Sequence, residues 1–417
     1  MSDIRFVLSE YAQGILAYSI DVQSNRLETV SIYPNDYSHA TNLGDIFIAK
    51  VINVSKNINA AFIDYQKGQR GFLPLDDNYM PVLLNREYNG SIKVGDELIV
   101  QLETEAVRSK DPVFTVNLAL SGKYSVVTNA NKKKGVSKKC SKAVREKLLK
   151  IIPEDNKYGI ILRTNAGELI ATTQNDDAKL SIIETELRQL CSQMDILLTE
   201  GIHRTCYSKI WQAPPPYITL LRDRQNLEYS SLITDSQQLY EQLSVYLGIY
   251  VPELQEKLTF YTDSYPLQKR YSIETKLEGL LKSKVWLKSG AYLVIEKTEA
   301  MYVIDVNSGK NISKKVTSEY VLSINMEAAK EIMYQIRLRN LTGMILVDFI
   351  NMDSSKDREA LLHELRQHAK QDRIPTTIVD MTALELVEIT RQKNYKSLSE
   401  QVLAHFQPYH INEQNNN

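Results

Sequence analysis

The sequence predicts a mixed α/β and β protein of several domains, in which a β-rich first part precedes an α/β block. Its 417 residues are enough for two to four domains with a large buried core. Residues 4–107 are dominated by short segments in which apolar and polar residues alternate, which is typical of strands. Residues 271–382 instead alternate apolar runs with patterns of helical spacing, as expected for a sheet covered by helices.

Composition narrows the class of protein and its partners. The formal net charge is −1, so a polyanionic partner would have to meet local basic patches and not a global positive field. No apolar run approaches the roughly 18 residues that a membrane span needs, and none is expected. The three cysteines, Cys140, Cys191 and Cys206, have no metal-type spacing, which favours reduced thiols and a cytoplasmic location.

The first elements are predicted to be strands. Residues 4–34 alternate apolar and polar side chains, with turns expected at residues 11–14 and 23–25, and therefore predict a β-meander. Residues 43–75 and 92–107 are β-branched segments with glycine-bearing turns and no helical period. A small closed barrel is the expected arrangement of these segments, because closure removes exposed strand edges.

The middle of the chain combines a basic segment with a strand and a helix. Residues 132–150 carry nine basic residues against Glu146, which is typical of a solvated helix surface or of a mobile loop, and charge alone leaves both open. Residues 157–166 predict a buried strand that ends at Arg163 and Thr164. The next segment predicts an amphipathic helix whose apolar stripe is Leu180, Ile183, Leu187, Leu190 and Met194.

A proline run at residues 213–216 is expected to mark a domain boundary. Beyond it, helical patterns cover approximately residues 235–258, 271–287, 318–340 and 355–372. Apolar segments of strand character lie between or after them, at residues 291–298, 300–307, 343–350 and 376–382. This order predicts the α/β block.

Two of these strands end in acids. Asp305 and Asn307 lie two residues apart at the tip of one strand, so their side chains should point to the same side. Asp348 ends the neighbouring strand after a crossover helix. Ligands gather at strand ends in such sheets, and the three side chains therefore predict a shared site at one edge.

The chemistry of this group suits a hard cation. Two carboxylates and an amide oxygen match Mg²⁺, or Mn²⁺ as an alternative, whereas zinc favours histidine and cysteine. Such a metal could polarise a phosphodiester and activate a water molecule. The structural alternative is that Asp305 and Asp348 only cap turns, because acids are common at strand ends.

Two further groups could contact nucleic acid. Phe62 and Phe72 lie across a predicted hairpin of the barrel, where rings can stack on single-stranded bases, and Lys110 could meet a backbone phosphate. The alternative is that both phenylalanines fill the core, which is the commoner place for this residue. Arg337 and Arg339 could bind phosphates or be ordinary surface residues at a helix end.

Several motifs together resemble the ribonuclease E/G family. Its catalytic block is similar to "VIDVNSGK", "NMEAAKEIMYQIRLRNLTGMILVDFINM", "QDR" and "LVEITRQK". Its OB-fold RNA-binding domain is similar to "GDIFIAKVINV", "AAFIDY" and "RGFLPL", and its sensor of the RNA 5′ end to "LRT" at residues 162–164. The resemblance covers nearly the whole chain with the motifs in the same order.

The resemblance implies a nested architecture. An RNase H-like subdomain (residues 1–40 and 213–279) would be split by an OB-fold barrel (41–120) and a 5′-sensor domain (121–212). A DNase I-like α/β subdomain (280–400) would follow and carry the metal, and residues 401–417 would form a tail.

The resemblance also implies roles for individual residues. Asp305 and Asp348 would ligate Mg²⁺, and Asn307 would join or orient that site. The RNA clamp would consist of Phe62, Phe72 and Lys110, and the 5′-monophosphate pocket of Gly122, Val126, Arg163 and Thr164. The implied reaction is endonucleolytic hydrolysis of single-stranded, A/U-rich RNA to 5′-phosphate and 3′-hydroxyl ends, in RNA processing and decay.

The chain departs from the family pattern at two places. Long members follow "RQ[RK]" with a Cys-Pro-x-Cys zinc link and a dimerisation domain, but residues 391–417 contain no cysteine. No zinc is therefore expected, and a monomer or weak homodimer is expected in place of a zinc-linked tetramer. Asn351 stands where the family usually has an acid, which would weaken a contact around the metal pair without removing it.

Three functions remain compatible with these residues. A Mg²⁺-dependent endoribonuclease is favoured by the intact Asp305, Asn307 and Asp348. A non-catalytic RNA-binding protein of the same fold is the alternative. A phosphodiesterase acting on DNA is weaker, although an OB barrel accepts either nucleic acid.

Overall fold

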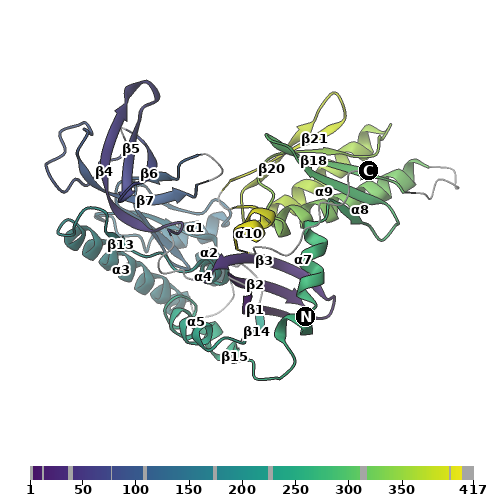
Figure 1. The fold of residues 1–417 in the computed structure, drawn as a ribbon, viewed down its shortest axis with the longest axis horizontal. Coiled ribbons are helices and arrows are strands. Elements are labelled where there is room, and N and C mark those ends of the chain that lie inside the picture. Colours follow the sequence, from purple (N-terminus) through teal and green to yellow (C-terminus); the bar gives the residue numbers. More distant parts are fainter. Residues whose placement is uncertain are drawn as a thin grey trace. The chain divides into compact units, whose positions relative to one another are not determined.

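The computed structural model describes residues 3–11, 14–35, 41–76, 78–106, 110–171, 176–223, 229–309, 317–393 and 396–405. The chain divides into two compact units, and Figure 1 labels many of their elements. The first unit comprises Met1–Asn35, Leu227–Gln242 and Glu256–Asn417, and the second comprises Asp36–Asn226 and Leu243–Gln255. Within the described residues, no helix is long and apolar enough to cross a membrane.

The first unit contains a five-stranded sheet in the order β15-β14-β1-β2-β3. Its strands are β1 (Ile4–Tyr11), β2 (Gly14–Asp21), β3 (Arg26–Pro34), β14 (Tyr229–Thr234) and β15 (Leu258–Phe260). The predicted meander is confirmed, because β1, β2 and β3 pair antiparallel in sequence order. The helices α6 (Leu267–Arg270), α7 (Ile273–Leu281) and α10 (Leu398–His405) supply core residues that include Leu267, Ile273 and Leu398.

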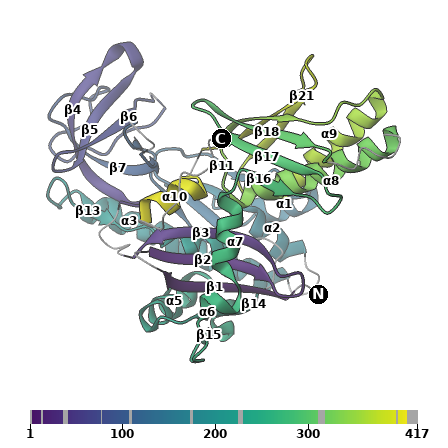
Figure 2. The ribbon, with the colours of Figure 1, turned by 45° about the vertical axis from the view of Figure 1, so that its right-hand side comes forward.

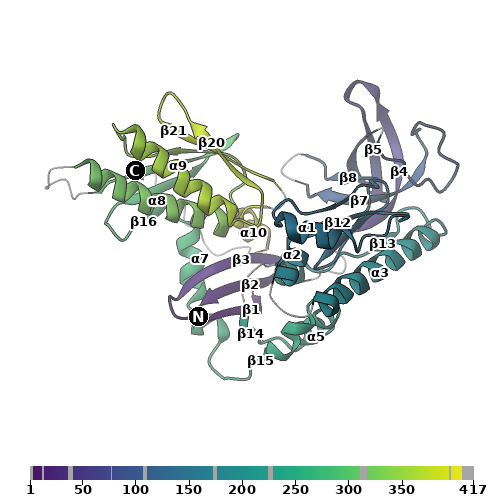
Figure 3. The same ribbon diagram turned by 180° about the vertical axis from the view of Figure 1, so that it is seen from behind.

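The same unit contains a six-stranded sheet in the order β16-β17-β18-β19-β21-β20. Its strands are β16 (Lys284–Trp286), β17 (Tyr292–Lys297), β18 (Met301–Asn307), β19 (Gly343–Asp348), β20 (Thr376–Met381) and β21 (Leu386–Arg391). Only β18 and β19 pair in parallel, joined by the crossover helix α8 (Ser318–Leu338). In Figure 3, α8 and α9 (Ser355–Lys370) lie together on one face of this sheet.

Alternation along the strands determines which face is buried. Ile304 and Val306 of β18 belong to the core beneath α8 and α9, while Asp305 and Asn307 between them are only partly buried. In β19, Ile345 and Val347 are buried and Asp348 is exposed. This period of two places the polar side chains on the face that the helices do not cover.

Two strands of this sheet differ from the sequence-based prediction. Helical spacing was expected through residue 287, but α7 ends at Leu281 and residues 284–286 form β16. Val285 packs against the core while Lys284 and Trp286 are exposed, which is strand periodicity. Strand β21 was not predicted, and it inserts between β19 and β20 through antiparallel pairs on both sides.

The second unit contains the predicted barrel. Its strands are β4 (Ile46–Ser55), β5 (Ala60–Gln66), β6 (Gln69–Pro74), β7 (Glu97–Thr104) and β8 (Val113–Thr115), with a short 3₁₀ turn η1 (Lys56–Ile58). The order β4-β5-β6-β8-β7 is closed by pairing of β4 with β7, and β13 (Lys209–Trp211) adds to β4. Gly71 is required inside this barrel because a Cβ there would lie 2.6 Å from the Phe114 ring.

A four-stranded sheet in the order β11-β12-β10-β9 accompanies the barrel. Its strands are β9 (Ala119–Ser121), β10 (Ser125–Thr128), β11 (Lys134–Val136) and β12 (Gly159–Leu162), and its helices are α1 (Lys142–Leu149), α2 (Thr164–Ala171), α3 (Asp176–Gly201) and α4 (Pro216–Asp223). The predicted amphipathic helix is confirmed as α3, whose Ile183, Leu187, Leu190 and Met194 are buried. Helix α2 was not predicted.

The basic segment 132–150 is neither entirely helix nor entirely loop. It forms strand β11 and helix α1, and α1 buries Leu148. Two further helical segments, α5 (Gln237–Tyr250) and η2 (Pro252–Lys257), contain residues of both units.

Candidate functional site

The two acids of the predicted site lie side by side on adjacent strands. Asp305 of β18 is the direct register partner of Asp348 of β19. Neighbouring strands are about 4.8 Å apart, so two carboxylates in register on one face are close neighbours. The expectation that these two strands bring their acids to a common position is confirmed by the backbone register.

Asn307 joins this pair through a hydrogen bond. Its Nδ2 donates to Oδ2 of Asp305 at 2.6 Å, so the amide fixes the orientation of that carboxylate. Partial burial, and then the neighbouring Asp305 charge, raise the pKa of Asp348 above its ordinary value. The two carboxylates therefore repel each other as they stand, and a cation between them would relieve that repulsion.

The donor set fits a hard divalent cation. Only oxygen ligands are offered by Asp305, Asp348 and Asn307, and such ligands suit Mg²⁺ or Mn²⁺ better than zinc. Within the described ranges, no three His, Cys, Asp or Glu residues gather to hold a metal. A Mg²⁺ bound here would therefore depend on two protein carboxylates and keep its other positions for water and substrate oxygens.

The predicted aromatic pair lies on the outer surface of the barrel. Phe62 of β5 and Phe72 of β6 are register partners with ring centroids 5.7 Å apart in an edge-on arrangement. Both are half-buried, while the barrel core is filled by other side chains, including Phe47 and Phe114. The alternative that Phe62 and Phe72 are core residues is therefore wrong.

Charged side chains surround this pair. The Arg70 guanidinium lies 4.2 Å from the centre of the Phe62 ring and pairs with Asp111, with Nε 2.9 Å from Oδ2. Lys110 is exposed beside Asp111. The chain continues from there to Pro112, whose carbonyl oxygen accepts from the Phe72 amide at 2.8 Å. Lys110 is therefore two residues from the position at which this segment is hydrogen-bonded to Phe72, and it is exposed to solvent.

The predicted 5′-end residues meet at the end of strand β12. Arg163 Nη1 donates to the Gly122 carbonyl oxygen at 2.8 Å and to Asp223 Oδ1 at 2.6 Å. Thr164 begins α2, and its hydroxyl lies 2.9 Å from the Ser137 hydroxyl. Val126 lies on the neighbouring strand, opposite Ile161. Arg163 is thus not a free surface residue but part of a fixed arrangement.

Asp223 holds two arginines at this position. Besides Arg163 it accepts from Arg222, whose Nε lies 2.7 Å from Oδ1. Burial works against ionisation of this carboxyl, but the Arg222 and Arg163 charges outweigh it and lower its pKa to about 2. The carboxylate is therefore ionised at neutral pH, and it compensates part of the positive charge beside Gly122.

Glu186 of α3 occupies the amide cluster next to Gly122. Its carboxylate accepts from the backbone amides of residues 123–125 at 2.7 to 2.9 Å and from the Ser125 hydroxyl at 2.7 Å. A Cβ at Gly122 would approach this carboxylate closer than 3.0 Å. An anion-binding cluster of amides is thus filled by a side chain of the protein itself.

The arginines near the end of α8 have a different role from those predicted. Arg339 is buried and donates to Gln335 Oε1 and to the Lys282 carbonyl oxygen, both at 2.7 Å. Burial lowers its pKa to about 10. Both proposed roles, phosphate binding and ordinary surface exposure, are therefore wrong for Arg339, which connects α8 to the end of α7. Arg337 is half-buried.

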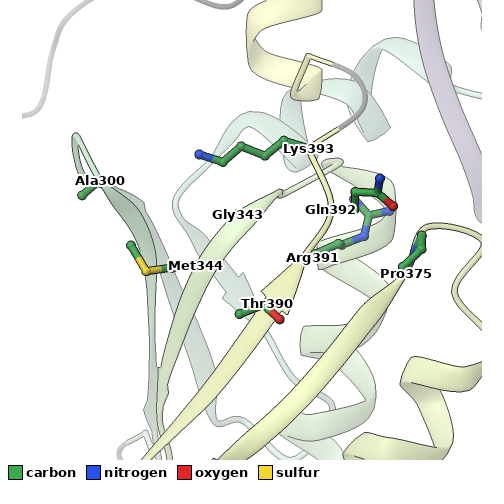
Figure 4. A pocket seen from close by; sticks show the side chains of 8 residues that line it. All are labelled: Ala300, Gly343, Met344, Pro375, Thr390, Arg391, Gln392 and Lys393. Carbon is green, nitrogen blue, oxygen red and sulfur yellow. The ribbon is translucent and has the colours of Figure 1, made fainter. Parts of the chain in front are cut away.

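A hollow of about 420 Å³ lies at the other end of the acid-bearing strands. Figure 4 shows its lining, including Met344, Thr390 and Lys393. Gly343, at the start of β19, lines it too, whereas Asp348 ends the same strand. The hollow is therefore separate from the acid pair.

Comparison with known proteins determines the family. A sequence model described as the ribonuclease E/G family matches residues 119–394. The chain is 31% identical over 371 residues to ribonuclease G of Escherichia coli K12, which covers 85% of this chain and 74% of that protein. The chain belongs to the ribonuclease E/G family.

Other ribonuclease E/G proteins match at similar length. Ribonuclease G of Haemophilus influenzae is 29% identical over 373 residues, covering 85% of this chain and 73% of that protein. Ribonuclease E of Buchnera aphidicola subsp. Schizaphis graminum is 27% identical over 400 residues, covering 93% of this chain and 39% of that protein. The resemblance found in the motifs is confirmed, and the chain is an endoribonuclease of the ribonuclease E/G family.

Two residues of this ribonuclease E/G chain were missed by sequence reasoning. Asp223 and Glu186 organise the 5′-end residues, yet Asp223 lies 60 positions from Arg163 and Glu186 lies 61 to 63 positions from the backbone amides that it binds. The "RD" pair of Arg222 and Asp223 ends the helix α4, and its sequence contains no local pattern that indicates this role. Asn351, noted as a departure from the family, is exposed, and within the described residues no hydrogen bond joins it to Asp305 or Asp348.

Proposed function

We propose that this endoribonuclease hydrolyses single-stranded RNA with Mg²⁺ as its cofactor and leaves 5′-phosphate and 3′-hydroxyl ends. The observation that carries the proposal is the register of Asp305 with Asp348, with Asn307 bonded to Asp305 on the same face. Mn²⁺ would replace Mg²⁺, because it takes the same oxygen ligands. RNA processing and decay in the cytoplasm is the cellular role that fits this activity.

The residues of the chain divide the work in the proposed reaction. Asp305 and Asp348 would hold the metal, and the hydrogen bond from Asn307 would keep the Asp305 carboxylate in a fixed orientation. A bound Mg²⁺ supplies polarisation of the phosphodiester and a lower pKa of the attacking water. Partial burial, and after it the Asp305 charge, raise the pKa of Asp348, and a bound cation would offset the repulsion between the two carboxylates.

Binding residues outside the acid pair would select the RNA. Phe62 and Phe72 offer half-exposed rings for stacking of unpaired bases, and Lys110 offers a charge for a phosphate. A duplex cannot present its base faces in this way, which favours single-stranded RNA, and A/U-rich segments are the least structured.

The 5′ end of the RNA would be read by a second group. Arg163 has a guanidinium anchored through Nη1, while Nε and Nη2 have no partner within the described part of the chain. Together with the Thr164 hydroxyl these donors suit a terminal monophosphate, with Gly122 and Val126 as the neighbouring wall. This group supports a preference for 5′-monophosphorylated RNA.

The same proposal assigns the four subdomains. Residues 1–40 and 213–279 would form the RNase H-like subdomain, residues 121–212 the sensor, and residues 280–400 the DNase I-like catalytic part. The barrel would correspond to residues 41–120. Support comes from the four separate sheets of the described residues and from the order of motifs along the chain.

The decisive experiment is cleavage of a 5′-monophosphorylated single-stranded RNA with and without Mg²⁺, with both product ends mapped. We expect Asp305→Asn and Asp348→Asn to lower the rate by about a thousandfold, because a neutral amide is a poor Mg²⁺ ligand of the same size. RNA affinity should stay near that of the unaltered protein.

Asp353→Asn is the matched control, because Asp353 is an exposed acid five residues beyond Asp348. It should cut at the unaltered rate. Equal rates for all three variants in Mg²⁺ would contradict the assigned metal site. RNA binding without any Mg²⁺-dependent cleavage by the unaltered protein would establish the non-catalytic alternative.

A further inference from the structure

An exposed aromatic group lies at the β16 edge of the six-stranded sheet. Trp286 of β16 is 64% exposed, and its ring centroid lies 5.2 Å from that of Tyr292 of β17. The Lys284 ammonium lies 4.2 Å from the centre of the Trp286 ring and 3.7 Å from that of Tyr292. We refer to Lys284, Trp286 and Tyr292 as the edge platform.

Strand register places the edge platform on the same face as the acid pair. Trp286 pairs with Tyr292, which in turn pairs with Asn307. Two residues further along the strands, Lys284 pairs with Val294, the partner of Asp305. Figure 2 shows β16, β17 and β18 side by side. Side chains in one row share a face, so Trp286, Tyr292 and Asn307 form a continuous line.

The opposite side chains of these strands confirm the orientation. Leu293 and Val306 are buried in the core, and Val285 packs against it. These residues alternate with the edge platform and point toward α8 and α9. The platform therefore stands on the uncovered face and is not a misplaced part of the core.

The distance from the platform to the acids suits a neighbouring nucleotide. Trp286 and Asp305 are two strands and two residues apart, which corresponds to roughly 12 Å between their backbones. A polynucleotide whose phosphate lies at Asp305 and Asp348 would carry a flanking base across β17 to Trp286. Tyr292 lies between them and would line the path.

The chemistry of the platform matches one nucleotide of single-stranded RNA. An exposed indole ring stacks on any base, and Lys284 beside it offers a charge for the adjoining phosphate. Tryptophan is enriched at interfaces, because its large ring combines apolar faces with a polar N–H group. A site for apolar protein side chains would not need the lysine across both rings.

We propose that Lys284, Trp286 and Tyr292 form a binding subsite in which Trp286 stacks on a base flanking the scissile phosphate and Lys284 pairs with the RNA backbone. This inference rests on the proposed endoribonuclease function. It gives an RNA-binding role to residues other than the acid pair, the two barrel phenylalanines and the residues around Arg163. Lys284 covers the rings in the absence of RNA and moves to the phosphate when a base arrives.

Fluorescence tests the subsite without any cleavage. The chain has two tryptophans, so Trp211→Phe leaves Trp286 as the only indole reporter. We expect its emission to be quenched when short single-stranded RNA is added in EDTA. In a series of RNAs that each carry a single abasic nucleotide at a different position, quenching should be lost only in the RNA whose missing base would stack on Trp286. Quenching that does not depend on any base would overturn the stacking assignment.

Substitution tests the contribution to affinity. Trp286→Ala should weaken binding of single-stranded RNA in EDTA by about 5- to 150-fold, and Trp286→Phe should recover most of it because the ring is kept. Tyr265→Ala is the matched control, since Tyr265 is also exposed (54%) but belongs to the segment after β15. Unchanged affinity of Trp286→Ala would overturn the subsite.

The outcome for the subsite is separable from that for the proposed function. If base-dependent quenching occurs and no RNA is cut in Mg²⁺, the endonuclease proposal fails and the subsite stands. If RNA is cut in Mg²⁺ while Trp286→Ala binds and cuts like the unaltered protein, the subsite fails and the endonuclease stands. If an apolar peptide quenches Trp286 and RNA does not, the platform is a protein-binding surface and the inference is wrong.

Discussion

Acidic residues of this protein differ according to what surrounds each one. Asp348 is next to another carboxylate, and partial burial and that neighbour raise its pKa. Asp223 is less exposed than Asp348, and burial disfavours its ionised form, but two arginines lower its pKa to about 2. Binding of a cation would thus stabilise the ionised form of Asp348, whereas Asp223 is already ionised and balances the charge of two arginines.

Asp223 makes stability depend on pH in acid. Its folded pKa of about 2 lies below the ordinary value of 3.8, so its contribution is complete above pH 4 and is lost as pH falls toward 2. The contribution is about 2 kcal/mol. Asp223→Asn should lower the free energy of unfolding near neutral pH and flatten its decline between pH 4 and 2. Urea unfolding at several pH values measures the free energy of unfolding of the two proteins. A constant difference between them from pH 7 to pH 2 would contradict the prediction.

Arg163 is expected to set the preference for the RNA 5′ end. Arg163→Gln should slow cleavage of 5′-monophosphorylated RNA by about tenfold to a hundredfold, which corresponds to a charge-assisted hydrogen bond of about 1.5–3 kcal/mol. Cleavage of the same RNA with a 5′-hydroxyl should be unchanged, since no phosphate is present to bind. Comparing initial rates on the two RNAs measures this, and the 5′-hydroxyl rate also reports any loss of folded protein.

Arg188→Gln serves as the control, because Arg188 lies on α3 with a side chain that is 77% exposed. It should leave both rates unchanged. Equal rates of the unaltered protein on the two RNAs would exclude the sensor assignment without affecting the metal site.

The contact between helix α3 and the β9–β10 turn depends on a glycine. Helix α3 is connected to the β9–β10 turn through Glu186, whose carboxylate accepts four hydrogen bonds there. Gly122 leaves room for that carboxylate. The absence of a side chain at one position thus permits a long helix to be anchored to a sheet.

This junction predicts a coupled pair of substitutions. Gly122→Ala should lower the free energy of unfolding by about 1–3 kcal/mol, because the new methyl group enters the space of the Glu186 carboxylate. The same change should have little effect when Glu186 is already alanine. Gly135→Ala is the control, since a Cβ at Gly135 meets nothing within 4 Å. Denaturant unfolding of the unaltered protein, the two single variants at positions 122 and 186, their double variant and the control measures this, and equal losses in both backgrounds would contradict the proposed contact.

Strands β18 and β19 could be predicted from the sequence, and their short neighbours could not. Apolar runs ending in Asp305 and Asp348 are a local signal that periodicity reveals. Strand β16 has three residues, which is too short to show a period, and its alternation was hidden in an apparent helix. Strand β21 and the row of Trp286, Tyr292 and Asn307 depend on antiparallel pairing between distant segments, which composition does not reveal.

Charge sets the character of RNA binding for the molecule as a whole. Fifty lysines and arginines oppose 51 acids, so the net charge does not attract a polyanion. Attraction must come from particular cations, and three carry proposed phosphate contacts: Lys110, Arg163 and Lys284. Stacking by Phe62, Phe72 and Trp286 would supply a part of the affinity that salt does not screen.

This balance predicts a weak dependence of RNA binding on salt. Each phosphate contact to single-stranded nucleic acid contributes about −0.7 to the slope of log Kobs against log salt, so three contacts give about −2. Lys284→Gln or Lys110→Gln should each reduce the steepness by about 0.7. Lys356→Gln should not, because Lys356 lies on α9, on the helix-covered side of the six-stranded sheet. Titrations in EDTA from low to high salt measure these slopes. A much steeper slope for the unaltered protein would mean that cations beyond these three bind the RNA backbone, and an unchanged slope in Lys284→Gln would remove the phosphate contact assigned to the edge platform.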